Sequence, residues 1–218
     1  MIQGTVKNVV PRPYGAVVLG ALFPLVCPGC GVPGAPLCPR CAEHLHPPRP
    51  APPPAGVDAW GAAFAYEGVA RELVARVKYR NVRAVVPWLS VAMVTAFDRL
   101  DAAPAVVTWA PTSRERRRRR GFDPAELLAR SVARRLATRC VGLLDRLPGP
   151  PQTGLAADAR RRGPRFVTRR HLPGLASVLV IDDVATTGAT LAAAADALRG
   201  AGAIRVVALT AARTPPPF

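Results

Sequence analysis

One segment near the carboxyl terminus limits the possible folds more than any other. Residues 178–181 are Val-Leu-Val-Ile, a short apolar run, and two carboxylates, Asp182 and Asp183, follow directly. A turn of small and hydroxyl residues comes next, and residues 190–199 have a helical pattern. A buried strand that leads through a polar turn into a helix is typical of an open α/β sheet, where ligands bind at the carboxyl ends of the strands. The segment therefore predicts an α/β domain with a ligand site after residue 181.

The turn itself has the composition of a phosphate cradle. Gly188 lets the backbone approach a ligand, threonine hydroxyls add donors, and the following helix presents its positive end. Asp182 and Asp183 would repel each other in a buried place unless ribose hydroxyls or a hydrated Mg²⁺ satisfied them. The alternative is a plain helix cap with an ordinary turn, but the combined pattern favours a ligand site. The candidate residues are the carboxylates Asp182 and Asp183 and the turn residues Val184, Ala185, Thr186, Thr187, Gly188, Ala189 and Thr190.

Apolar periodicity elsewhere extends the α/β prediction. Strands are expected at residues 59–66, 105–110, 140–144, 176–181 and 204–210. Helices are expected at residues 69–78, at 85–100 with a break near Pro87, at 124–136, and at 190–199. Asp123, Pro124 and Glu126 form a capping pattern at the start of the third of these helices. Strands that alternate with helices predict a mainly parallel sheet flanked by helices.

Four of the five cysteines form two close pairs, Cys27 with Cys30 and Cys38 with Cys41, and seven residues separate the pairs. Two Cys-x-x-Cys knuckles supply the four thiolates of a closed structural zinc site, which has no open position for catalysis. An iron–sulfur cluster and thiol redox chemistry are the alternatives. Cysteines used in this way indicate a reducing, cytoplasmic location. The fifth, Cys140, is expected to be a small buried side chain.

A proline-rich run divides the chain. Residues 47–56 contain six prolines, which exclude a helix or an interior strand and predict a stiff linker. The linker separates an N-terminal segment with the cysteine module (1–46) from the main domain (57–213), and residues 214–218 form a tail. No stretch reaches the roughly 18 apolar residues that a membrane span needs. The longest, at residues 16–26, is expected to pack beside the cysteine module.

The net charge of +16 favours polyanionic partners. However, 28 of the 30 basic residues are arginine, since Lys7 and Lys78 are the only lysines. A bias toward Arg, Ala and Pro also arises from GC-rich coding sequence. The charge by itself is therefore weak support for a nucleic-acid partner.

Three basic segments could contact a charged ligand. The first begins with the turn Pro111, Thr112, Ser113 and Arg114 and continues to Arg120, with six arginines in the seven residues 114–120. These arginines either hold pyrophosphate oxygens or form a solvated, nucleic-acid-facing run. The second contains Gln152 and Arg160 and suits a mobile lid or a plain surface loop. The third is Lys78, for which spacing alone favours a cation at a helix C-terminus.

Together these motifs resemble the ComF family of competence proteins, and residues 178–190 resemble the signature of type I phosphoribosyltransferases. The resemblance covers the paired cysteines, residues 78–80, 117–122, 152–155, 160 and 166, and the motif 182–190. This chain departs from the family pattern at Asp123-Pro124, where Asn-Gln is usual. It also departs at Gly163, where Asn is common, and at Ala185, where an aromatic residue is usual. The departures put activity in doubt more than the fold.

The resemblance implies a type I phosphoribosyltransferase fold with an N-terminal zinc module. It implies that Asp182 and Asp183, the candidate catalytic pair, address the ribose hydroxyls of phosphoribosyl pyrophosphate (PRPP), that the turn 186–190 holds the 5′-phosphate, and that Mg²⁺ accompanies the ligand. It further implies a role in DNA uptake, with a DNA-uptake helicase as a candidate partner. Phosphoribosyl transfer, sensing of PRPP without turnover, and a non-catalytic adaptor for single-stranded DNA remain three alternatives.

Overall fold

The computed structural model describes residues 26–215, apart from residues 36, 81, 149–162, 173 and 175. The apolar run expected at residues 16–26 therefore lies outside the described residues except for Val26, and residues 216–218 of the tail also lie outside them. The lid candidates Gln152 and Arg160 also lie outside them. Within the described part of the chain, no helix has the length and apolar character needed to cross a membrane.

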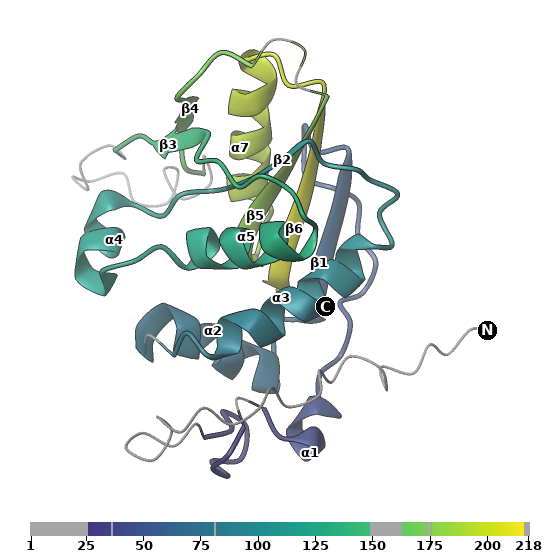
Figure 1. The fold of residues 1–218 in the computed structure, drawn as a ribbon, viewed down its shortest axis with the longest axis vertical. Helices are drawn as coiled ribbons and strands as arrows, with labels where there is room; N and C mark the ends of the chain where they lie inside the picture. Colours follow the sequence, from purple (N-terminus) through teal and green to yellow (C-terminus); the bar gives the residue numbers. More distant parts are fainter. Residues whose placement is uncertain are drawn as a thin grey trace.

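A four-stranded parallel sheet forms the centre of the molecule (Figure 1). Its strand order is β1 (Ala59–Ala65), β6 (Arg205–Arg213), β5 (Ser177–Ala185) and β2 (Val106–Trp109). All three neighbouring pairs are parallel, which confirms the predicted open α/β sheet. Strand β5 is longer than its apolar run because pairing with β6 continues through the two carboxylates to Ala185.

Helices cover both faces of the sheet. On one face, α2 (Gly68–Arg80), α3 (Val85–Phe97) and α5 (Pro124–Arg135) share a core with Leu179 and Ile181. On the other face, α7 (Ala189–Gly200) packs on Val178 and Val180. A small antiparallel pair, β3 (Leu144–Arg146) and β4 (Phe166–Thr168), joins the core on the α7 side. The sheet lies between these layers because alternate residues of β5 are buried on opposite faces.

Three sequence predictions were wrong in detail. Helix α3 is not broken near Pro87, because Pro87 is its third residue, where a backbone N–H has no partner within the helix. The predicted strand at residues 140–144 begins only at Leu144, and Cys140 makes an isolated bridge to Val107. The arginine run, for which no helix was predicted, forms α4 (Arg114–Arg120).

The cysteine module is packed onto the main domain. It contains the short helix α1 (Pro39–Ala42), and Cys27, Leu37, Cys41 and Leu45 belong to the same buried cluster as α2 and α3. Residues 47–56 form no helix or strand, as their prolines predict. This run lies along α7, since Arg199 donates to the carbonyl of Gly56 over 2.8 Å. The boundaries of the predicted domains stay a prediction.

Candidate functional site

The two adjacent carboxylates lie near the carboxyl end of β5. Residues 178–181 of β5 alternate between the two core clusters, and Asp183 lies on the same face as Leu179 and Ile181, toward α2. There Lys78 of α2 places its Nζ 2.9 Å from Asp183 Oδ1, and the two side chains are only 17% and 15% exposed. Asp182 Oδ1 accepts a hydrogen bond of 2.8 Å from the Asp183 N–H. One carboxylate is therefore neutralised by an ion pair, while the other is held by the backbone.

The electrostatics of the pair are unequal. Burial, and then the negative charge of Asp183, raise the pKa of Asp182 well above its ordinary value. Burial alone would lower the pKa of Lys78, but the charge and hydrogen bond of Asp183 outweigh it and raise that pKa. Ionisation of Asp182 therefore costs free energy in the ligand-free protein. Donors such as hydroxyl groups, or a cation, would lower that cost.

The turn after β5 has a conformation that needs glycine. Gly188 stands at the N-cap of α7 with φ of 77°, in the left-handed region. A Cβ at this position would lie 2.8 Å from Cγ of Pro54, a residue of the proline-rich run. Gly163 lies against Ala189 in a similar way, with a Cβ position 3.2 Å from Ala189 Cβ. Two other segments therefore lie against Gly188 and Ala189, while Thr186 and Thr187 remain exposed.

Substitution of Gly188 tests this turn. Gly188→Ala is expected to destabilise the protein by about 2 kcal/mol, because a left-handed alanine costs 1–2 kcal/mol and the new methyl group meets Pro54. The measurement is the free energy of unfolding in urea. Gly200→Ala, at the other end of α7 with open space around it, is the matched control and is expected to be neutral or slightly stabilising. Equal effects of the two variants would contradict this description of the turn.

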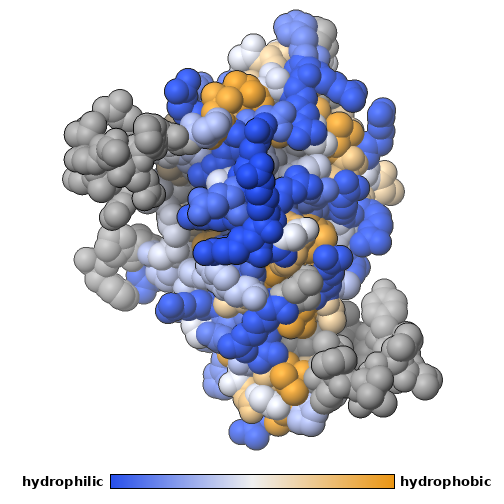
Figure 2. Space-filling view, turned by 90° about the vertical axis from the view of Figure 1, so that its left-hand side faces the viewer, coloured by the Kyte–Doolittle hydropathy of each residue, from blue (hydrophilic) through white to orange (hydrophobic). Residues whose placement is uncertain are grey.

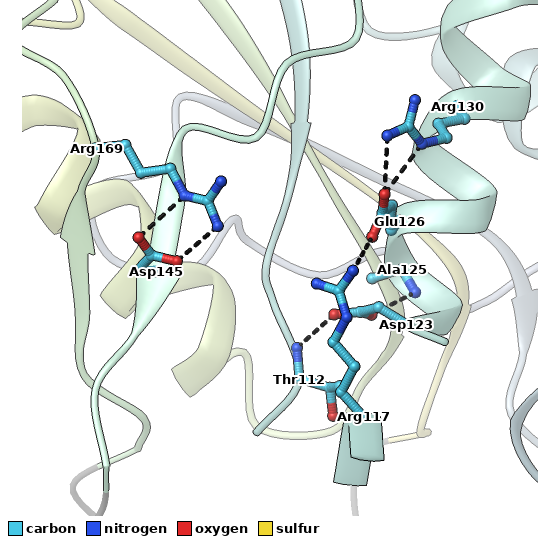
Figure 3. Close-up of polar contacts among 8 residues, drawn as sticks. All are labelled: Thr112, Arg117, Asp123, Ala125, Glu126, Arg130, Asp145 and Arg169. Carbon is cyan, nitrogen blue, oxygen red and sulfur yellow. Dashed lines mark hydrogen bonds and ion pairs between the residues drawn. The ribbon is translucent and has the colours of Figure 1, made fainter. Parts of the chain in front are cut away.

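The turn after β2 is tied to the start of α5 by a third carboxylate. Asp123 is 2% exposed, and its Oδ2 accepts from the Thr112 N–H over 2.8 Å. Its Oδ1 caps α5 by accepting from the Ala125 N–H over 3.1 Å, which confirms the predicted cap (Figure 3). Burial raises the pKa of Asp123, and the negative charge of Asp183 adds to this effect. The turn that starts at Pro111 is thereby fixed near the carboxylates of β5.

The basic run forms an exposed helix with defined ends. Ser113 Oγ accepts from the Arg116 N–H over 3.3 Å, and Gly121 ends α4 in the left-handed conformation. Arg117 forms an ion pair with Glu126 of α5 (Figure 3), with a nitrogen–oxygen distance of 3.3 Å. Arg120 stacks over the ring of Tyr79 at the end of α2, 4.9 Å from its centroid. Residues 114–119 are otherwise exposed, and Figure 2 shows mostly hydrophilic side chains on this side of the molecule.

The structure brings two of the predicted site residues, Lys78 and Asp183, together from separate parts of the chain. Lys78 was assigned to a helix C-terminus by its spacing, and the structure adds its ion pair with Asp183. The sequence analysis did not identify Arg146 of β3. Its pKa is lowered, mainly by burial and then by the charge of Arg116, and the charge of Asp182 partly opposes this shift. The sequence analysis also missed Thr210, which lies opposite Asp182 in β6 and has a buried hydroxyl without a partner among the described residues. No local pattern marks Arg146 or Thr210, since only the tertiary fold places them beside β5.

A second candidate site is the cysteine cluster. The four sulfur atoms of Cys27, Cys30, Cys38 and Cys41 all lie within 4.8 Å of one another. Sulfur atoms at zinc–sulfur distances of about 2.3 Å in a tetrahedron are roughly 3.8 Å apart, so the cluster is close to the size that a metal requires. Such a four-cysteine cluster could hold a structural metal such as zinc.

The surroundings of the thiols also suit a cation. Burial opposes ionisation of Cys27, but the N–H groups of Cys38, Cys30 and Gly29 lower its pKa to about 6. Burial and the neighbouring thiols raise the pKa of Cys41 to about 12. Four thiolates so close together need a positive ion between them, because each charge opposes the ionisation of the next.

A comparison with models of protein families finds no match, and no curated protein matches the chain. The α/β fold is compatible with a phosphoribosyltransferase-like domain, and the four cysteines are compatible with a zinc module. Function must therefore be argued from the residues of the two sites.

Proposed function

We propose that the chain binds PRPP, or another ligand that contains ribose 5-phosphate, together with Mg²⁺ at the carboxyl end of β5. The observation that carries the proposal is the position of Asp182 and Asp183 directly before the glycine-capped start of α7. The carboxylates can accept hydrogen bonds from ribose hydroxyls, and the N–H groups of residues 186–190 can donate to the 5′-phosphate. The turn Pro111–Arg114 would supply contacts to the pyrophosphate. In line with the family resemblance, we propose a role for this binding in DNA uptake.

Calorimetry with PRPP and Mg²⁺ tests the proposal. We expect micromolar binding by the intact protein and no binding by Asp182→Asn/Asp183→Asn. Asp182→Asn alone leaves the ion pair of Lys78 and Asp183 in place, so it separates loss of ligand contacts from loss of stability. Asp98→Asn removes an exposed carboxylate at the end of α3 and is expected to leave binding unchanged. Failure of the folded, metal-loaded protein to bind PRPP would refute the proposal.

A binding result leads to a second measurement. Release of pyrophosphate in the presence of nucleobases would identify a transferase that acts on PRPP. Binding without release across the bases tested would support a PRPP sensor. Among the described carboxylates, Asp123 accepts two backbone hydrogen bonds and Asp183 is paired with Lys78, so neither is available as a general base for an incoming nucleophile.

A second candidate function is favoured by α4, whose arginines are exposed from Arg114 to Arg119. They could bind the phosphates of single-stranded DNA. Affinity for an oligo(dT) strand should then fall steeply as the salt concentration rises. In a plot of log affinity against log salt concentration, Arg116→Ala/Arg118→Ala/Arg119→Ala should reduce the steepness of the slope by about two. PRPP should compete with DNA only if both occupy the carboxyl end of β5.

A further inference from the structure

A groove lies on the helical layer between the first turn of α3 and the exposed side of α5. Its volume is about 520 Å³, within the range of roughly 300–1,000 Å³ that is usual for binding pockets. None of the residues that line it belongs to the candidate site at β5. The groove therefore needs an explanation of its own.

The floor of the groove is apolar. Val86 and Pro87 line it from α3, and Leu127 and Ala133 line it from α5. Val86 and Ala133 are buried in the protein core, with 7% and 2% exposure, while Pro87 is exposed at the edge. An aliphatic or aromatic side chain of a partner would be shielded from water on this floor. Its burial would stabilise the complex by about 25 cal/mol for each Å² of apolar surface removed from water.

Arginine side chains also line the groove. Arg83, Arg130 and Arg134 line it, and no carboxylate is among its lining residues. Arg83 stacks on the ring of Phe122, 5.6 Å from the centroid. Arg130 is held by Glu126 at 2.9 Å, while Arg134 is exposed in the last turn of α5. Because two of the three guanidinium groups are already held in place, an incoming anion would lose less side-chain entropy on binding.

We propose that this groove binds an acidic segment of a partner protein, with one apolar side chain on the floor and flanking carboxylates on the arginines. Arginine around an apolar centre is the usual composition of a protein interface. A nucleic acid fits less well, because stacking of bases needs an exposed aromatic ring, and none lines the groove. The rings beside its arginines, Phe122 at Arg83 and Trp109 at Arg130, are both buried.

Cys140 offers a direct test because it lines the same groove and the other four cysteines form the metal cluster. The metal-loaded protein would be equilibrated in a thiol redox buffer with three peptides, each with a C-terminal cysteine. Their sequences are Glu-Glu-Leu-Phe-Glu-Cys, its Lys analogue Lys-Lys-Leu-Phe-Lys-Cys, and the polar Glu-Glu-Ser-Ser-Glu-Cys. The fraction disulfide-bonded to Cys140 measures how well each peptide fits, and Cys140→Ser gives the background. Burial raises the pKa of Cys140, so the mixtures must be followed until the fractions stop changing.

We expect the acidic apolar peptide to be trapped about tenfold more than either of the others, which corresponds to about 1.4 kcal/mol. Arg130→Glu/Arg134→Glu should reverse the preference between the acidic and the basic peptide. Arg134→Glu alone changes an exposed position and serves as the test if the double variant does not fold. It should reduce the preference for the acidic peptide. Arg118→Glu/Arg119→Glu on α4 makes the same change of charge elsewhere and should leave the preference within about twofold.

Three results would overturn the proposal. Equal trapping of the polar acidic peptide would show that the apolar floor is not used. An equal loss in the α4 variant would show attraction by the overall charge rather than by the groove. Displacement of the peptide by oligo(dT) that depends on Arg130 and Arg134 would show a nucleic-acid surface instead.

Discussion

Replacement of Lys78 by methionine is expected to destabilise the protein by about 3 kcal/mol at neutral pH. The Lys78 ammonium lies 2.9 Å from Asp183, and both side chains are largely buried. Removal of one partner of such a pair leaves a buried charge without compensation, which typically costs about 3–5 kcal/mol. Urea unfolding measures the effect, and Arg80→Met, an exposed cation two residues further along α2, is the matched control with an expected effect under about 0.5 kcal/mol.

A double variant separates the ion pair from simple packing. Lys78→Met/Asp183→Asn should recover part of the lost stability, because no charge is then left unpaired. The pH dependence has a defined sign. The pKa of Lys78 is raised in the folded protein, so its contribution is fully present below the unfolded pKa of about 10.4 and is lost as pH rises through the folded value. A cost for Lys78→Met no larger than that for Arg80→Met would contradict the buried ion pair.

This pair marks the limit of what the sequence could predict. The position of Asp182 and Asp183 at a strand end follows from an apolar run and the turn after it, both of which are local signals. The partner of Asp183 is more than one hundred residues away, and no periodicity connects Lys78 to it. The local pattern predicted that Lys78 lies at the end of its helix, which is correct. The pattern did not predict the contact with Asp183.

The helix α4 was missed for a different reason. Its signals were present in the sequence, with Ser113 before the first turn, Glu115 within it and Gly121 after the last residue. The six arginines between these caps have no apolar periodicity, which is the main signal of a helix in a sequence. The boundaries of β5 were missed because polar residues ended the apolar run, while pairing with β6 kept the backbone extended to Ala185. Strand length was set by the neighbouring strand, which the local pattern does not describe.

The four-cysteine cluster could hold a structural metal such as zinc, and removal of a metal bound there is expected to have the largest effect of all. Structural zinc sites of this kind bind with apparent free energies of about 10–16 kcal/mol, much of which is folding free energy. Cys27 and Cys41 are buried in the same core as α2 and α3, so loss of the module should weaken the main domain as well. Chelation, or Cys41→Ser, should lower the melting temperature by more than about 10 °C, since 1 kcal/mol corresponds to 2–4 °C for a chain of this size.

The metal content gives the identity of the ion. One zinc per chain without visible absorbance would support zinc, whereas iron with charge-transfer bands would support an iron–sulfur cluster. Cys140→Ser removes a thiol outside the cluster and is expected to keep both the metal and the melting temperature to within a few degrees. An unchanged melting temperature on complete removal of the metal would contradict a structural role.

A finer variant keeps all four ligands and still disturbs the site. A Cβ at position 29 would lie 2.6 Å from Cys41 Sγ and 3.1 Å from a methyl group of Val69 in α2. Gly29→Ala must therefore displace either the sulfur or the module as a whole, because α2 is held in the main core. We expect metal affinity to fall at least tenfold in a competition with a chromogenic chelator, while the number of bound ions at saturation stays the same. A variant that binds metal as tightly as the intact protein would show that the module is not fixed against α2 and that the two units do not share one core.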